Sequence, residues 1–356
     1  MRVSAIAAVF SFAALLGAQV RSSPPHPAGK TPVPVSAIAL HESSRKSIVS
    51  EIGGAFMFPS RCDADGNLYI RKYATDRPLL GPVVKIDGEG KRVALFDPAA
   101  FPQLKLDRAD AFAPALDGGL YQIAAAGVSK TQIYVLHFSP DGSPSSPIRL
   151  DADFQPYQVA AFAEGNLLAS GFQRDLQNKS DQGRAFTAVF SADGRLLTQL
   201  SFEPLPAPPR ATAKSATKPV AGEAQQSAPT LDLADSEPGL DGSVYSMRRS
   251  SPALIYVISP AGKILRTLKV GGPAPGVMPN TFHVSGNRLA VSFWDDNTHS
   301  QTLVVTDAQT GRRIANYSDP GGLGPSFACY SADDGVFTFL HLGEGNALEV
   351  IRAEPR

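Results

Sequence analysis

Six turn signals recur along the chain at nearly even spacing, and each is followed by a short run of β-forming residues. Their glycines, separated by 52, 47, 77, 44 and 49 residues, are Gly66, Gly118, Gly165, Gly242, Gly286 and Gly335. Such a rhythm is typical of propeller blades, because a four-stranded blade takes about 40–50 residues and buries its faces only against its neighbours. The chain is therefore predicted to be all-β, a six-bladed β-propeller of four-stranded antiparallel blades.

A weaker turn signal lies about half a period after each of the first five. Examples are Asp87-Gly88-Glu89-Gly90 and Pro140-Asp141-Gly142, which indicate hairpins that join the third and fourth strands of a blade. The last blade lacks this signal and has no room for an outer strand before Arg356. Val35 to Leu40 is a spare strand at the other end. We predict that it completes the last blade, closes the ring and removes an exposed edge.

The first residues have the pattern of an export signal. Arg2 precedes the apolar run Ala5 to Leu16, and small residues surround Ala18. This predicts a signal peptide over 1–18, followed by a disordered leader over 19–34 that is rich in Pro and Ser. The apolar run is too short to span a bilayer. We therefore expect a secreted or periplasmic protein with no membrane span.

An insertion accounts for the long step between Gly165 and Gly242. Residues 204–230 are rich in Pro, Ala, Thr, Lys and Gln and hold almost no large apolar side chain. Such a segment cannot bury enough surface to offset the entropy lost on ordering. We expect a flexible surface insertion within a propeller domain over 35–356, with a docking tether as the alternative.

The balance of charges in the sequence argues against partners that are strongly anionic. The 33 Lys and Arg residues equal the 33 Asp and Glu residues, and the formal net charge is +0. A neutral chain lacks the basic field that attracts nucleic acid or an anionic membrane surface. We therefore expect no nucleic-acid partner.

The repeated unit resembles the six-bladed propellers of the NHL and TolB-like group. It consists of an apolar strand, a turn and a Leu-Tyr or Val-Tyr strand, as in Asp65 to Tyr69 and Asp241 to Tyr245, and later a hairpin with Gly-Lys or Gly-Arg. The resemblance covers nearly the whole mature chain outside the leader and the insertion. It implies a fold more than a function, because the group includes scaffolds, lactonase-type and esterase-type hydrolases, a peptide-amidating lyase and sensor ectodomains. The hydrolases use carboxylates and an asparagine around a central metal, and no such set can be matched to this chain.

The two cysteines occupy corresponding places in the first and last blades. Cys62 precedes Gly66 by four residues, and Cys329 precedes Asp334 by five. Both are predicted to end the innermost strands of blades that are neighbours in a closed ring. Because an exported location permits a disulfide, we predict that a Cys62–Cys329 bridge staples the closure. Two buried free thiols are the alternative.

Catalytic and metal motifs are few. No Gly-x-Ser-x-Gly elbow, His-Glu-x-x-His helix or phosphate-binding glycine loop occurs. Asp63 to Gly66 looks like part of a calcium loop, but Lys72 stands where a bidentate glutamate is needed, so a hairpin turn is the interpretation. A metal could be held by a loop group, although each member also has a structural or solvent-exposed explanation: His299, His341, Asp295 and Asp296. Our prediction is no metal and no cofactor.

One face of the ring is predicted to carry a charged concave mouth. The loops between the second and third strands open there, together with the loops between blades. The residues expected on this face are Arg71, Lys72, Arg174, Arg248, Arg249, Trp294, Asp295 and His341. A guanidinium group binds planar anions bidentately, so these residues are candidates for binding a carboxylate, a sugar acid or a peptide. Ordinary solvated loop charges are the alternative.

Two classes of function follow from these observations. With no catalytic motif and with long variable loops, we expect a monomeric binding or scaffold protein for a peptide, a protein or a small anionic ligand. The alternative is a lactonase-like or esterase-like hydrolase with a metal in the central channel.

Overall fold

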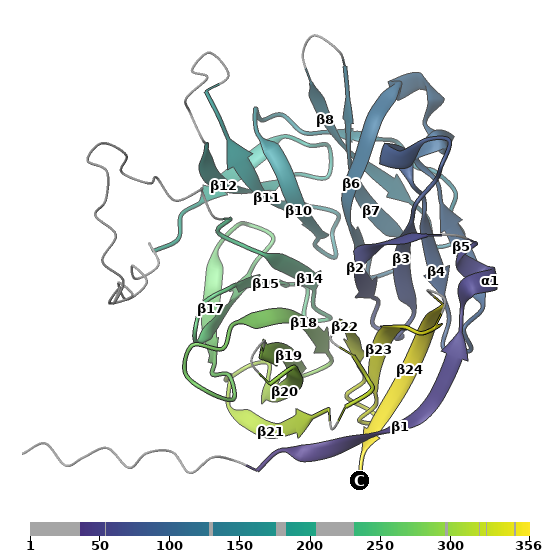
Figure 1. Cartoon of the computed structure of the whole chain (residues 1–356). Helices are drawn as coiled ribbons and strands as arrows, with labels where there is room; N and C mark the ends of the chain where they lie inside the picture. Colours follow the sequence, from purple (N-terminus) through teal and green to yellow (C-terminus); the bar gives the residue numbers. More distant parts are fainter. Residues whose placement is uncertain are drawn as a thin grey trace, which may run out of the picture. The chain divides into compact units, whose positions relative to one another are not determined.

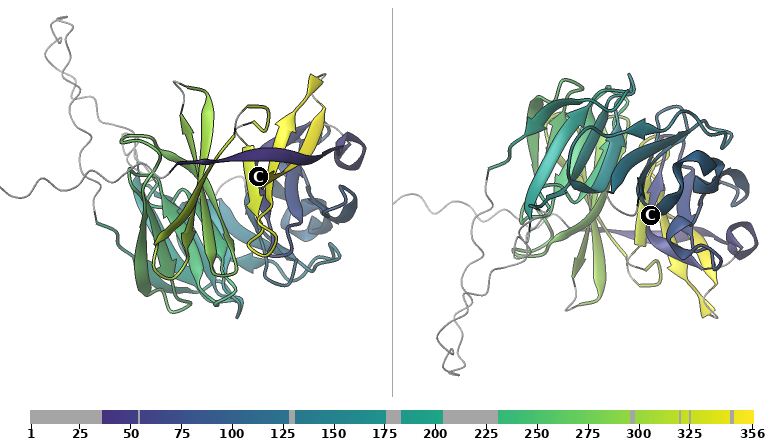
Figure 2. Two further views of the ribbon diagram at one scale, coloured as in Figure 1. Left: turned by 90° about the horizontal axis from the view of Figure 1, so that it is seen from below. Right: turned by 90° about the horizontal axis from the view of Figure 1, so that it is seen from above.

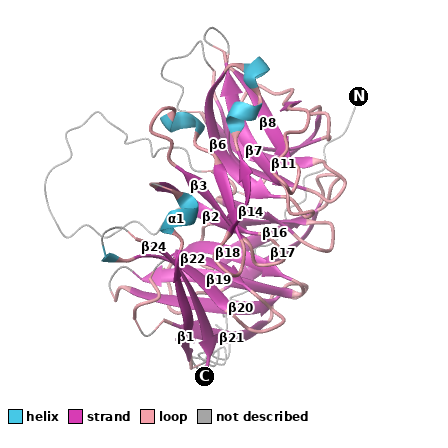
Figure 3. Ribbon diagram, turned by 90° about the vertical axis from the view of Figure 1, so that its right-hand side faces the viewer, coloured by secondary structure: helices cyan, strands magenta, loops and turns pink. Residues whose placement is uncertain are grey.

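The computed structural model describes residues 36–53, 55–127, 131–175, 183–203, 231–295, 298–319, 321–324, 326–344 and 347–356. The predicted signal peptide (1–18), leader (19–34) and insertion (204–230) lie outside these residues. Strands dominate the described chain (Figure 3). Its helical elements are α1 (Val49–Ile52), η1 (Pro78–Leu80), η2 (Pro98–Ala100) and η3 (Pro102–Leu104). Within the described residues, no helix has the length and hydrophobicity needed to cross a membrane.

Four antiparallel sheets of four strands each follow one another along the chain (Figure 1). The first contains β2 (Phe56–Cys62), β3 (Leu68–Lys72), β4 (Val83–Ile86) and β5 (Arg92–Phe96). The second contains β6 (Leu106–Pro114), β7 (Leu120–Ala126), β8 (Gln132–Phe138) and β9 (Ile148–Arg149). The third contains β10 (Gln155–Ala161), β11 (Leu167–Gln173), β12 (Arg184–Phe190) and β13 (Leu196–Leu200). The fourth contains β14 (Asp235–Pro238), β15 (Val244–Arg248), β16 (Ala253–Ile258) and β17 (Ile264–Val270).

The remaining strands form one eight-stranded sheet in the order β18-β19-β20-β21-β1-β24-β23-β22. One half contains β18 (Pro279–Ser285), β19 (Arg288–Asp295), β20 (Ser300–Asp307) and β21 (Arg313–Ser318). The other half contains β22 (Ser326–Tyr330), β23 (Phe337–Leu342), β24 (Leu348–Pro355) and β1 (Ile38–Ser47). The sequence predicted separate four-stranded blades, whereas the structure joins these two sets of four strands into one sheet.

Strand β1 connects the two halves of the eight-stranded sheet. It runs antiparallel to β24 from the pair Leu40–Pro355 to the pair Ser47–Glu349. Figures 1 and 2 show the purple β1 beside the yellow β24. Its contact with β21 is parallel and limited to Ile38 and Ala39. The added strand therefore lies next to the end of the chain as expected, but it begins later and is longer than the predicted Val35 to Leu40.

The first strands of the four smaller sheets and of the two halves of the eight-stranded sheet contact one another in a closed cycle. Along the chain each first strand touches the next, and the last touches the first; the members are β2, β6, β10, β14, β18 and β22. Sheets that radiate from such a cycle of inner strands form a β-propeller. The chain is thus an all-β propeller built from antiparallel four-stranded sheets and one joined sheet.

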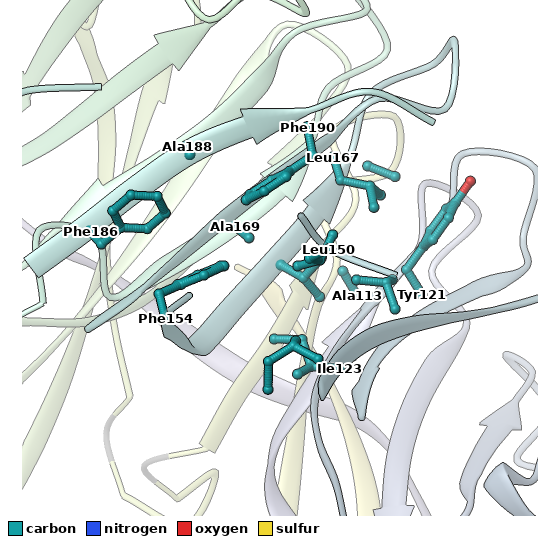
Figure 4. Packing of buried hydrophobic residues seen from close by; sticks show 14 of the residues in the cluster. Ala113, Tyr121, Ile123, Leu150, Phe154, Leu167, Ala169, Phe186, Ala188 and Phe190 are labelled. Atoms are coloured by element: carbon teal, nitrogen blue, oxygen red, sulfur yellow. The ribbon is translucent and has the colours of Figure 1, made fainter. Parts of the chain in front are cut away.

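Apolar side chains fill the spaces between neighbouring sheets. One cluster packs Ala113 and Ile123 of the second sheet against Leu167 and Phe190 of the third (Figure 4). Comparable clusters of buried residues lie at the other sheet contacts, including the contact between the two halves of the eight-stranded sheet. Each sheet therefore buries its faces against its two neighbours, and none is stable alone.

Among the repeated turn signals, the first contacts the second sheet as well as closing a hairpin. In the first, the Asp63 carboxylate accepts hydrogen bonds from the backbone N–H groups of Asp65 and Asn67 at 3.1 and 2.9 Å. The Tyr69 hydroxyl lies 3.0 Å from Asp63 Oδ2 and 2.7 Å from the carbonyl oxygen of Gly118, in the turn of the second sheet. Burial, and next the Asp63 charge, raise the pKa of Tyr69, so the hydroxyl stays protonated.

A disulfide joins Cys62 at the end of β2 to Cys329 in β22. Their Cα atoms are 5.8 Å apart although 267 residues separate them in sequence. The bridge lies between the first strands of the first and last sheets, where the sequence predicted it.

Candidate functional site

The inner strands bring buried charges into the centre of the propeller. Arg61 of β2 forms an ion pair with Asp235 of β14, with Nη2 2.7 Å from Oδ1 and Nη1 3.3 Å from Oδ2. The two side chains are 5% and 4% exposed. Asp235 also accepts a hydrogen bond from Thr281 Oγ1 at 2.8 Å and one from the backbone N–H of Ser236 at 3.0 Å. Each oxygen of this carboxylate therefore has two donors, as a buried charge requires.

A second buried pair links the next two inner strands. Glu237 Oε2 of β14 lies 3.1 Å from His283 Nδ1 of β18 and accepts a hydrogen bond from the backbone N–H of Val284 at 3.0 Å. Glu237 and His283 are 5% and 4% exposed. The Arg61–Asp235 pair thus joins β2 to β14, and the Glu237–His283 pair joins β14 to its neighbour β18.

A cavity of about 220 Å³ opens beside Arg61 and is lined by residues of three inner strands, β2, β6 and β10. Its walls come from β2, β3, β6 and β10, and its lining residues are Pro59, Arg61, Arg71, Arg108, Asp110, Ala111, Phe112, Gln155, Pro156, Tyr157 and Gln158. We call this space the arginine cavity. It combines three guanidinium groups and two side-chain amides with one carboxylate, so its lining favours an anion.

The charges of the arginine cavity are unevenly paired. Arg108 Nε forms an ion pair with Asp110 Oδ2 at 2.8 Å, without the alignment of a hydrogen bond. Arg71 instead has a single long contact, from Nη2 to the carbonyl oxygen of Leu79 at 3.5 Å. Among the described residues, no carboxylate forms an ion pair with Arg71. Burial lowers the pKa of Arg71, and the charge of Asp110 opposes that shift.

Two donors that line the arginine cavity have no partner. The Nε groups of Arg61 and Arg71 are buried and make no hydrogen bond. Buried polar groups in folded proteins are nearly always paired with protein or with water. Arg61 is almost completely buried. Arg61 and Arg71, which both line the cavity, therefore each carry one buried donor without a hydrogen-bond partner.

The opposite end of the sheets carries an acidic hollow. A cavity of about 340 Å³ is bordered by the turns that follow β2 and β22, with Asp65, Asp333, Asp334, His283 and Arg352 in its lining. Because β2 and β3 are antiparallel, the turn between them lies at the end opposite Arg71. The two cavities therefore differ in the charge of their linings.

The structure separates the residues that the sequence assigned to one mouth. Only Arg71 lines the arginine cavity; its neighbour Lys72 is half-buried and does not. Arg248 is buried, donates a hydrogen bond to the carbonyl of Glu203 and lies 3.6 Å from Asp232. It lines a different groove of about 640 Å³ beside β16 and β17.

The other predicted residues lie on further strands and loops. Arg249 donates a hydrogen bond to the carbonyl of Asn280 at 2.9 Å. Arg174 is exposed after β11, Trp294 and Asp295 are half-buried in β19, and His341 is half-buried in β23. None of these lines the arginine cavity. Their role in ligand binding stays a prediction.

The described residues contain no group of three or more His, Cys, Asp or Glu side chains placed to hold a metal. Asp296, a member of the candidate loop group, lies outside those residues, and His299 is exposed. The buried carboxylates of β14, Asp235 and Glu237, have Arg61 and His283 as partners instead. The sequence reasoning missed Arg61, Arg108 and Asp110, although charged residues inside short inner strands were a usable signal.

Comparison with known proteins adds little beyond the fold. No protein-family model and no curated protein matches this chain. A luciferin-regenerating enzyme is 11% identical with a TM-score of 0.47, covering 87% of this chain and 95% of that one. The Pan2 WD40 domain of Neurospora crassa is 12% identical with a TM-score of 0.45, covering 90% and 97%. A protein of unknown function from Bacteroides caccae is 13% identical with a TM-score of 0.43, covering 73% and 80%. Likenesses at this level carry no argument about activity.

Proposed function

We propose that this chain is an exported six-bladed propeller of the NHL and TolB-like kind, which binds an anionic ligand in the arginine cavity. Counting each half of the eight-stranded sheet as one blade gives six, in agreement with the six turn signals. The pattern of residues 1–18 and the Cys62–Cys329 disulfide support a secreted or periplasmic location, because structural disulfides persist in oxidising compartments.

The observation that supports anion binding most directly is the uneven ion pairing of the arginines in the arginine cavity. Arg61 and Arg108 each have a carboxylate partner, whereas Arg71 has only the 3.5 Å contact with a carbonyl oxygen. A guanidinium that lines a cavity and has no carboxylate partner is a candidate donor to a planar anion. A ligand bound there would lie at the mouth of the channel, between the first three blades.

The binding proposal is tested by thermal unfolding of the mature protein with a panel of small anions. Acetate, sulfate, phosphate and citrate are titrated at constant ionic strength, because a ligand that binds only the folded state raises the melting temperature. At least one anion is expected to raise it in the wild type and to have a much smaller effect in Arg71→Gln.

The matched control is Arg195→Gln. Arg195 also carries a guanidinium, but its side chain is 74% exposed and pairs with Asp193, away from the cavity. This variant should respond to each anion as the wild type does. Equal responses of the wild type and Arg71→Gln to every anion would contradict binding in the arginine cavity.

The hydrolase alternative gains no support from the described residues. It needs a cluster of carboxylate, amide or imidazole side chains around a metal. The buried Asp235 and Glu237 have Arg61 and His283 as partners, which leaves no such cluster among the residues that the structure describes. Binding is therefore the function that we propose.

A further inference from the structure

The lining of the arginine cavity also includes apolar rings, which come from β2, β6 and β10. Pro59, Phe112, Pro156 and Tyr157 contribute rings to the lining. Phe112 is 5% exposed, whereas Tyr157 is 41% exposed and stacks edge-on against Phe172 with ring centroids 5.5 Å apart. Such a rigid aromatic surface offers contact area to a flat apolar group at little cost in conformational entropy.

The charge count sets the charge of the ligand. The cavity holds three guanidinium groups, of which Arg61 is paired with Asp235 and Arg108 with Asp110. One positive charge, on Arg71, is left over. A dianion would bring a second negative charge toward Asp110, which also lines the cavity and would repel it. A monoanion matches the site.

The size of the cavity limits the body of the ligand. Its volume of about 220 Å³ is below the range of about 300–1,000 Å³ that is usual for drug-sized ligands. A single ring with a short acid chain is the kind of group that such a space holds.

We propose that the arginine cavity binds one carboxylate carried on a compact, flat apolar body, with Arg71 holding the carboxylate and Tyr157 covering the apolar group. This inference rests on the proposed anion binding and narrows it to a chemical class. Two sources share that chemistry: a free aryl-substituted carboxylic acid, and the last residue of a peptide with an aromatic side chain.

Isothermal titration calorimetry of the full mature chain with matched probes tests this class. The probes are 3-phenylpropanoate, acetate, which lacks the apolar body, and 3-phenylpropanamide, which lacks the charge. We expect 3-phenylpropanoate to bind at least about tenfold more tightly than either, because it combines a charge-assisted hydrogen bond with apolar burial.

Two substitutions should separate the two contributions. Arg71→Gln is expected to abolish the preference for the acid over the amide, and Tyr157→Ala to reduce the preference for 3-phenylpropanoate over acetate. The controls are Arg195→Gln and Tyr73→Ala. The exposed fraction of Tyr73, 40%, is similar to that of Tyr157, but Tyr73 does not line the cavity. Circular dichroism of each variant verifies that it is folded.

The outcomes distinguish this inference from the proposed function. If phosphate or acetate binds as tightly as 3-phenylpropanoate in an Arg71-dependent manner, the apolar class is wrong while anion binding stands. If no anion shows Arg71-dependent binding, both proposals fall.

A second pair of probes identifies the source of the carboxylate. A tetrapeptide ending in phenylalanine is compared as free acid and as C-terminal amide. Tighter binding of the free-acid peptide than of 3-phenylpropanoate supports a peptide end, and weaker binding supports a free acid. The inference would be overturned if neither carboxylate mattered for affinity. In that case the peptide acid would bind as tightly as the peptide amide, and 3-phenylpropanoate would bind as tightly as 3-phenylpropanamide.

Discussion

Arg61 and Asp235 form a buried two-point ion pair between the first strands of the first and fourth sheets. Their atoms approach to 2.7 and 3.3 Å, and 174 residues separate them in sequence. The pair therefore fixes the distance between parts of the propeller that no backbone ladder connects, since β2 and β14 belong to different sheets. Arg61 of this pair also lines the arginine cavity.

Breaking the Arg61–Asp235 ion pair should lower the free energy of unfolding. Arg61→Met leaves the Asp235 carboxylate buried without its cation, and we expect a loss of about 3–5 kcal/mol in the free energy of unfolding. The double variant Arg61→Met/Asp235→Leu should recover much of that loss, because no uncompensated charge remains. Urea unfolding followed by circular dichroism measures both. Stability of Arg61→Met equal to that of the wild type would contradict a structural role for the pair.

The Cys62–Cys329 disulfide should stabilise the ring mainly by restricting the unfolded chain. For its sequence separation of 267 residues, removal with Cys62→Ala/Cys329→Ala is expected to cost about 2–4 kcal/mol. Urea unfolding with and without reductant checks this value. The double variant is its own control, since reductant should leave it unchanged; a wild type insensitive to full reduction would refute the prediction.

The Arg77–Asp97 pair should make stability depend on acid pH. Burial alone would raise the pKa of Asp97, but the hydrogen bonds from Arg77 and the backbone N–H of Ala99 outweigh it and lower the pKa. The pair's contribution is therefore fully present above the unfolded value of about 3.9 and is lost as pH falls through the lower folded value.

Asp97→Asn tests this dependence. The variant should be less stable than the wild type at neutral pH, and the difference should shrink in acid below the ordinary carboxyl range. Asp76→Asn is the control, because Asp76 is 78% exposed and lies 3.7 Å from the same Arg77. The measurement is the free energy of unfolding of each protein across the acid pH range. A difference between the wild type and Asp97→Asn that stays the same at every pH would count against the prediction.

Tyr69→Phe should weaken the link between the first two sheets. The substitution removes the hydroxyl that lies 2.7 Å from the carbonyl of Gly118 and leaves the ring in place. Lys85 Nζ stays 3.2 Å from the same carbonyl, so the expected loss is only about 1–2 kcal/mol. Tyr134→Phe is the comparison, because the Tyr134 hydroxyl contacts Gln132 of its own strand. A larger loss in Tyr134→Phe than in Tyr69→Phe would argue against the linking role.

The turns were predictable from sequence because their geometry is local. Glycines at positions such as Gly66 and Gly118 adopt φ values of 78° and 87°, a region that side chains disfavour, so the residue type marks the turn. The closing strand was only partly predictable. Seven of its residues, 41–47, are polar or charged, because β1 lies at the periphery and much of it faces solvent. An exposed strand lacks the apolar alternation by which strands are found.

The candidate site depended on long-range register that the sequence does not display. The position of Arg71 at the loop between the second and third predicted strands of its blade is a local feature, which the turn signals indicate. Arg61 and Asp235 meet only because the ring brings their strands together, and no local pattern links residues so far apart. Arg248 shows what loop position leaves out, since this side chain is buried and donates a hydrogen bond to the carbonyl of Glu203, while its role in ligand binding stays a prediction.

The pairing of β1 with β24 sets an order on folding. Strand β1 leaves the ribosome early, yet its main partner is made some three hundred residues later, and pairings so distant in sequence form slowly. Until then β1 must persist as an unpaired strand without recruiting another chain. Its exposed Lys, Arg and Ser side chains suit that interval, because charges on a free edge discourage aggregation. The polar character of β1 therefore suits a strand whose edges stay free until the ring closes.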